Sequence, residues 1–317
     1  MDRKKFLKLG GVAALSLPVS RFLTVLHSES GPASELFFNI SLAQWSLHRT
    51  IRSGDLDHLD FPAIAKNEFG IEAVEYVSTF FQDRAEDYSY LDEMNMRCND
   101  LGVEQLLIMV DGEGGLAVAD DKTRAESVEN HYKWVKAAEY LGCHSIRVNA
   151  YGEGSKEEQK QYAVDGLGRL AEFSKDHNIN VIVENHGGYS SDGRWLSDVI
   201  SRVGMENCGT LPDFGNFCVK RENGGLWDGS CTEEYDRYRG VKELMPFAKA
   251  VSAKSYDFDE KGQETTIDFS KMLSIIYASG FKGYIGIEYE GDELSEFEGI
   301  KATKRLLIEA GSKITEG

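Results

Sequence analysis

Residues 179–185 read INVIVEN, an aliphatic run that ends in the polar pair Glu184 and Asn185. A short apolar run with β-branched residues is typical of a strand buried on both faces. Comparable runs recur along the chain, with first residues 29 to 42 positions apart, close to the length of one strand–helix unit. The eight runs begin near Asn39, Ile71, Glu104, His144, Ile179, Cys208, Ala250 and Tyr284.

Helical patterns fill the intervals between these runs, as in the amphipathic stretches 125–141 and 156–177. Several intervals end at a glycine, which can cap a helix because it accepts a positive φ. These glycines are Gly70, Gly102, Gly142, Gly204 and Gly283. Eight strand–helix units over residues 32–317 predict an α/β fold, a single (β/α)8 TIM barrel. A doubly wound open sheet is the alternative, but no Gly-x-Gly-x-x-Gly motif follows the first run.

The composition excludes several classes of protein. Of 317 residues, 41% are hydrophobic, which is enough for a large core. The chain has 35 basic and 53 acidic residues and a net charge of −18, which argues against nucleic acid as a partner. The spacing of the five cysteines predicts neither a disulfide framework nor a zinc site. They are Cys98, Cys143, Cys208, Cys218 and Cys231.

Residues 1–31 differ in character from the rest of the chain. Arg3, Lys4, Lys5 and Lys8 precede an apolar run, Leu9–Ser20. This order predicts an export signal, and the run is too short for a stable membrane span. The start resembles the twin-arginine export motif, with Lys4 in place of the second arginine. We therefore expect a periplasmic or other extracytoplasmic protein without a membrane span after processing. Because no Ala-x-Ala cleavage site follows, an uncleaved anchor is the alternative.

Charged side chains stand at the ends of the late runs, where a TIM barrel carries its active site. Glu184, Asp213 and Glu288 close or follow the fifth, sixth and eighth runs. Three confined carboxylates cannot all stay ionised unless a proton or a cation intervenes. The oxygen ligands favour Mg²⁺ or Mn²⁺, and a contribution from His186 would favour Mn²⁺, Co²⁺ or Zn²⁺. Lys254, in the seventh run, is a catalytic candidate or a counter-ion to these carboxylates.

Further polar side chains are expected to line the same cavity. Strand alternation places Arg147 and Asn149 on one face of the fourth run, and Gln44 precedes Trp45 at the end of the first. Amides and charged groups bind hydroxyls while aromatic rings stack on a sugar. The lining therefore predicts a small-molecule carbohydrate substrate. The candidate substrate-binding residues are Glu75, Arg147, Asn149, His186 and Asn216.

The motifs VENH, PDFGN, SAKSYDFD and GIEYEG resemble those of the xylose isomerase-like TIM barrels, the sugar phosphate isomerase/epimerase superfamily, over residues of about 37–311. The resemblance implies a divalent metal bound by Glu184, Asp213 and Glu288. It also implies a histidine ligand on the seventh strand, but Ser252 occupies that position. His186, Asn216 or water are the candidates to complete the set of ligands.

The resemblance also implies a mechanism. Glu184 and Glu288 would remove and return a proton next to a carbonyl through an enediolate, on a free sugar or keto-sugar. Lys254, His186 and Arg147 would stabilise the oxyanion. A metal-dependent isomerase or epimerase is the leading hypothesis. The alternatives are a lyase or dehydratase acting by β-elimination on a keto-sugar, keto-glycoside or cyclitol, and a non-catalytic sugar-binding barrel. The sequence leaves open whether the chain forms a homo-oligomer.

Overall fold

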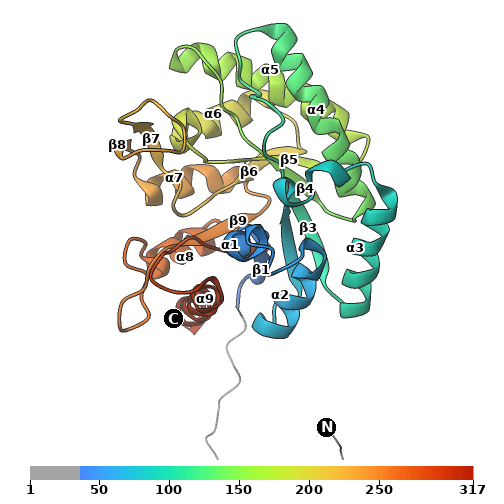
Figure 1. Ribbon diagram of the computed structural model, residues 1–317. Coiled ribbons are helices and arrows are strands. Elements are labelled where there is room, and N and C mark those ends of the chain that lie inside the picture. The colour runs from blue at the N-terminus through green and yellow to red at the C-terminus, as the bar shows by residue number, and fades with distance from the viewer. Residues whose placement is uncertain (1–35, 317) are drawn as a thin grey trace, which may run out of the picture. The chain divides into compact units, whose positions relative to one another are not determined.

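The computed structural model describes residues 36–316 (Figure 1). The predicted export signal, residues 1–31, lies outside this range. Eight parallel strands form the predicted barrel, in the order β6-β5-β4-β3-β2-β1-β10-β9. Isolated parallel bridges, Thr210 with Ala248 and Asp213 with Ser252, join the two ends of this sheet. The strands are β1 (Asn39–Ala43), β2 (Ala73–Val77), β3 (Glu104–Met109), β4 (Ser145–Val148), β5 (Asn180–Glu184), β6 (Cys208–Leu211), β9 (Val251–Ser255) and β10 (Tyr284–Tyr289).

Helices cover the outside of the sheet (Figure 1). The short α1 (His48–Arg52) follows β1, and the longer helices are α2 (Phe61–Phe69), α3 (Tyr88–Leu101), α4 (Asp121–Tyr140), α5 (Lys156–Lys175), α6 (Gly193–Val203), α7 (Arg237–Leu244), α8 (Phe269–Ala278) and α9 (Glu296–Glu316). Local chemistry fixes several helix ends. Ser155 and Glu158 form a capping box at the start of α5, and Gly70 ends α2 in the left-handed conformation. No helix within residues 36–316 is long and apolar enough to cross a membrane.

The inside of the barrel contains an apolar cluster and has a polar mouth. Leu107, Met109, Ile182 and Leu211 belong to a buried cluster that is separate from the larger core. Strand alternation puts Glu184, two residues beyond Ile182, on the same inward face. The polar residues at the strand ends therefore lie above this buried apolar cluster.

The first strand is shorter than its sequence predicted. The run from Asn39 continues to Leu47 in the sequence, but β1 ends at Ala43 and residues Gln44–Leu47 form a 3-10 helix. Gln44 is fully buried there, where its amide lies 2.8 Å from His58 Nδ1 and accepts from the Val77 amide. Gln44 is therefore a structural link between segments, and the prediction that it lines the cavity is wrong.

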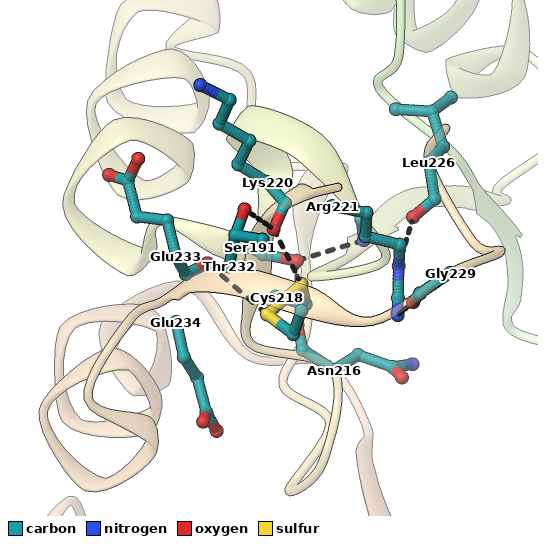
Figure 2. The surroundings of a disulfide bond; sticks show 12 residues. Ser191, Asn216, Cys218, Lys220, Arg221, Leu226, Gly229, Thr232, Glu233 and Glu234 are labelled. Carbon is teal, nitrogen blue, oxygen red and sulfur yellow. Dashed lines mark hydrogen bonds between the residues drawn. A yellow bond between two sulfur atoms is a disulfide. The ribbon is translucent and has the colours of Figure 1, made fainter. Parts of the chain in front are cut away.

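A two-stranded antiparallel hairpin stands after β6, formed by β7 (Cys218–Arg221) and β8 (Cys231–Glu234). Cys218 and Cys231 form a disulfide, with 5.8 Å between their Cα atoms (Figure 2). The cysteine spacing did not predict this bond, because the two residues lie 13 positions apart and meet only when the hairpin pairs. The other three cysteines are free and buried.

Candidate active site

Three predicted metal ligands meet at the mouth of the barrel. Glu184 ends β5, Asp213 follows β6 and Glu288 lies near the end of β10. All three side chains are buried, and one carboxylate oxygen from each lies within 4.8 Å of the others. Within residues 36–316, no histidine or cysteine joins this cluster. The convergence follows from the barrel itself, because parallel strands bring their carboxyl ends to one rim.

Hydrogen bonds hold the three carboxylates in place. Asp213 Oδ1 accepts from the backbone amides of Gly215 and Asn216, each at 2.8 Å. The Asn216 side chain donates to Glu184 Oε1 at 2.8 Å. Ser252 Oγ lies 2.6 Å from Asp213 Oδ2 and 3.0 Å from Glu288 Oε2. Ser252 therefore stands between two of the carboxylates, at the position where the family resemblance implies a histidine.

Two buried cations, Arg147 and Lys254, pair with different carboxylates of the cluster. Arg147 Nε lies 2.9 Å from Glu184 Oε2, in an ion pair without hydrogen-bond geometry. Arg147 Nη1 donates to Asp111 Oδ1 at 2.8 Å. Lys254 Nζ lies 3.1 Å from Glu288 and 3.0 Å from Glu290. Each cation is therefore bound between a carboxylate of the cluster and a second, outer carboxylate.

Burial dominates the protonation of these groups. Desolvation raises the pKa of Glu184 to about 7 against the attraction of Arg147, with repulsion by Glu288 adding to the rise. Desolvation also raises the pKa of Asp213 to about 8, although Lys254 opposes it. Burial disfavours a charged Lys254, but Glu288 and Glu290 outweigh it and hold the lysine pKa well above its usual value. Burial thus favours the neutral, protonated forms of Glu184 and Asp213, while the lysine stays charged.

The donor set fits a divalent cation. Among the residues that the structure describes, six carboxylates contribute to this network, whereas two cations, Arg147 and Lys254, oppose them. The six are Glu75, Asp111, Glu184, Asp213, Glu288 and Glu290. A divalent ion among the central three would offset part of this excess, and oxygen ligands suit a hard ion such as Mg²⁺ or Mn²⁺.

A cavity of about 670 Å³ opens above this floor. The predicted residues that line it are Arg147, Asn149, Glu184, His186, Asn216, Lys254 and Glu288. His186 Nδ1 lies 2.9 Å from the Asn149 side-chain oxygen, and burial, followed by Arg147 and Lys254, lowers the pKa of His186 to about 4. A neutral imidazole beside an amide is suited to bind sugar hydroxyls.

Glu75 lies deeper than its predicted role requires. It is fully buried, does not line the cavity, and accepts a hydrogen bond from Ser41 at 2.6 Å. Its second oxygen, Oε2, has no hydrogen-bond partner. Desolvation raises the Glu75 pKa to about 7. The prediction of an inward-facing side chain holds, but the structure places Glu75 below the cavity.

Several cavity residues had no assigned role in the sequence. Asp111 lies two residues beyond the end of β3 and accepts hydrogen bonds from both Arg147 and Asn149; its position after an apolar run was the signal that could have found it. Glu290 shares the inward face of Glu288 and pairs with Lys254. Tyr151 and Trp227 lie on loops, where strand alternation gives no guide.

Residues 63–310 match the sequence model of the family described as "Xylose isomerase-like TIM barrel". The chain belongs to this family. A curated relative, the C-glycoside deglycosidase alpha subunit of Arthrobacter globiformis, is 33% identical over 66 residues. That match covers 20% of this chain and 19% of the relative, so the chain matches about a fifth of that protein's length.

Solved structures share the fold at low sequence identity. A protein crystallised with a zinc atom (IolI) is 15% identical over 87% of this chain and 99% of its own, with a TM-score of 0.65. An L-ribulose 3-epimerase is 16% identical over 88% and 96%, with a TM-score of 0.64. Similar structures also include a 3-keto-D-glucoside 4-epimerase from E. coli, 13% identical over 86% and 99% with a TM-score of 0.57, and a probable 3-DHS dehydratase from Bacillus anthracis, 15% identical over 85% and 98% with a TM-score of 0.62.

Proposed function

We propose that this protein is a metal-dependent isomerase or epimerase of a free sugar or keto-sugar, which acts by removing a proton next to a carbonyl. The observation that carries the proposal is the convergence of Glu184, Asp213 and Glu288, all buried and within 4.8 Å, at the barrel mouth. Two of these carboxylates come from β5 and β10, which are three strands apart around the barrel. They can therefore approach a bound sugar from different directions.

Each charged residue has a role in this reaction. Glu184 or Glu288 removes the proton as general base, and the other returns it on the opposite face. Glu184, Asp213 and Glu288 would hold the divalent ion, which when bound polarises the carbonyl and stabilises the enediolate. Lys254 and Arg147 supply positive charge to the developing oxyanion.

β-Elimination from a keto-glycoside is the second candidate. It begins with the same proton abstraction but ends in loss of the aglycone, which leaves through the glycosidic oxygen of an O-glycoside or through the attached carbon of a C-glycoside and takes up a proton. One observation favours it: the local match to a C-glycoside deglycosidase subunit, a protein whose name describes removal of a sugar from its aglycone. A dehydratase among the similar structures is compatible with the same elimination chemistry.

Proton NMR in D₂O tests the proposal and separates the two reactions. The Mn²⁺- or Mg²⁺-loaded protein is incubated with a panel of ketoses, 3-keto-sugars and 3-keto-glycosides. Deuterium at one carbon without loss of atoms supports isomerisation or epimerisation, whereas release of an aglycone or water supports elimination. Exchange that persists after exhaustive chelation would contradict the metal-dependent mechanism. A panel without any exchange, although sugars bind, would favour the non-catalytic barrel.

We further infer that the protein is exported. The basic and apolar order of residues 1–31 supports this, and so does the disulfide Cys218–Cys231, because disulfides persist mainly in oxidising compartments. Fractionation of the native cells, combined with mass spectrometry of alkylated cysteines, tests the inference. Recovery in the cytoplasmic fraction with both cysteines alkylated would contradict it.

A further inference from the structure

The long connection between β6 and α7 differs from the usual loop of a TIM barrel. A strand-to-helix loop commonly has about 2–6 residues, whereas residues 212–236 here contain a hairpin of their own. Long connections with internal structure are commonly functional, as lids or binding loops. This segment begins with the stretch that carries Asp213 and Asn216, so its base belongs to the floor of the site.

The hairpin is held in one shape by several bonds (Figure 2). The disulfide Cys218–Cys231 joins β7 to β8. Arg221 donates to the carbonyl oxygens of Leu226 at 3.2 Å and Gly229 at 2.8 Å, which fixes the turn between the strands. At the base, the Asn216 carbonyl accepts from Ser191 Oγ at 2.8 Å. The tip that carries Leu226 and Trp227 is therefore anchored from both ends.

The tip of the hairpin reaches back over the substrate cavity. Trp227 Nε1 donates to the His186 carbonyl at 3.3 Å, and the Trp227 ring lies edge-on to Tyr151 with 5.5 Å between centroids. Gly187 permits this approach, because a Cβ there would lie 2.6 Å from the Leu226 carbonyl oxygen. Even so, the Trp227 side chain is well exposed, with 46% of its residue surface accessible.

The cavity has two chemically distinct ends. Glu184, Glu288 and Lys254 line it at the floor, while Tyr151, Leu226 and Trp227 line it from the loops. Cavities that enclose drug-sized ligands measure roughly 300–1,000 Å³, and this one, at about 670 Å³, has room beyond a single sugar ring. An indole left partly exposed beside a polar sugar site is suited to stack on a second ring.

We propose that Tyr151, Leu226 and Trp227 form a second subsite that binds the ring attached to the reacting keto-sugar, so that the substrate is a keto-glycoside and not a free sugar. The attached ring is an aromatic aglycone or a second sugar, because both present a flat or C–H-rich face to Trp227. This inference rests on the proposed function for the reacting sugar at the floor. The disulfide-linked hairpin then selects substrates by the ring attached to the reacting sugar. This selection is independent of the proton abstraction.

Binding experiments test the subsite without requiring turnover. Isothermal titration of the Mn²⁺-loaded full chain compares methyl with phenyl glycosides of D-glucose, D-galactose and D-xylose, and with cellobiose, lactose and xylobiose. We expect at least one ring-bearing ligand to bind about tenfold more tightly than its methyl partner. A gain for phenyl glycosides alone identifies an aromatic aglycone, and a gain for disaccharides identifies a second sugar.

Substitutions of Trp227 test whether the hairpin causes this gain in affinity. Trp227→Ala is expected to abolish it, and Trp227→Phe to retain most of it. Tyr88→Ala serves as the matched control, since Tyr88 is similarly exposed at 49% but does not line the cavity; it should keep the whole gain. No gain in any series, or a gain that survives Trp227→Ala, overturns the subsite. Failure of the proposed function is a separate result, the absence of deuterium exchange into any sugar.

Discussion

The charged floor of this cavity and its hairpin rim are built in opposite ways. Glu184, Glu288 and Lys254 lie on barrel strands, are buried, and are fixed by ion pairs. Trp227 lies on an inserted hairpin, is half exposed, and is held by one disulfide and a few hydrogen bonds. Buried charges fixed on strands suit proton transfer, while an apolar surface on a separate, disulfide-linked hairpin suits the selection of substrates. Substitutions in the two regions should therefore affect different measurements.

Glu184→Gln should have the largest effect. The amide can neither accept the substrate proton nor provide a charged ligand, and it removes the partner of Arg147. We expect deuterium exchange to fall by at least about a thousandfold, since general base catalysis alone contributes about 10²–10⁴. NMR in D₂O measures the rate.

Glu309→Gln, an exposed substitution on α9, is the control for Glu184→Gln and should exchange at the native rate. Circular dichroism establishes that both variants are folded. Exchange by Glu184→Gln within tenfold of the native rate would remove Glu184 from the mechanism and weaken the division between floor and rim.

Lys254→Met should mainly reduce stability. It leaves the buried Glu288 and the half-buried Glu290 without their shared cation, and removing one partner from a buried ion pair costs about 3–5 kcal/mol. Glu290→Gln keeps Lys254 paired with Glu288 and should cost less, about 1–2 kcal/mol. Urea unfolding of the metal-free proteins gives both values. Equal losses for the two variants would mean that Lys254 does not bridge the pair as described.

The floor was largely predictable from the sequence, because strand alternation decides which side chains point inward. Glu184 follows the buried Ile182 by two residues, and the same rule places Ser252 with Lys254. Strand alternation does not predict, however, how deep in the barrel an inward-facing side chain lies. Glu75 faces inward but lies below the cavity, at a level set by the pairing of Leu42 with Val74 and Ala43 with Glu75.

The rim was not predictable by the same rule. Its position depends on a turn between β7 and β8 and on a disulfide that forms only when those strands pair. Neither feature has a periodic signal in the sequence. The prediction for the first strand failed for a related reason. The strand alternation stops at Ala43, where a 3-10 helix begins and turns Gln44 away from the cavity.

Ser252→Ala should weaken metal binding without abolishing it. Ser252 Oγ lies within hydrogen-bond distance of Asp213 and Glu288, and loss of an outer partner typically costs about 10–100-fold in metal affinity. Ser255→Ala is the matched control, because Ser255 lies on the same strand but bonds Thr303 of α9. Mn²⁺ titration followed by electron paramagnetic resonance measures free ion. Equal affinities in both variants would show that Ser252 does not orient the ligands.

Breaking the disulfide should have the smallest effect and confine it to the rim. Replacing Cys218 and Cys231 together with serine frees the two strands, while backbone bonds such as Tyr235 N to Phe217 O, at 2.8 Å, still hold the base of the hairpin. We expect the preference for ring-bearing glycosides to fall about threefold, less than for loss of the Trp227 ring itself. Cleavage by protease within residues 222–230 should become faster. If the double variant instead lost metal affinity as strongly as Ser252→Ala, the hairpin would be part of the floor's support, and the two regions could not be treated as independent.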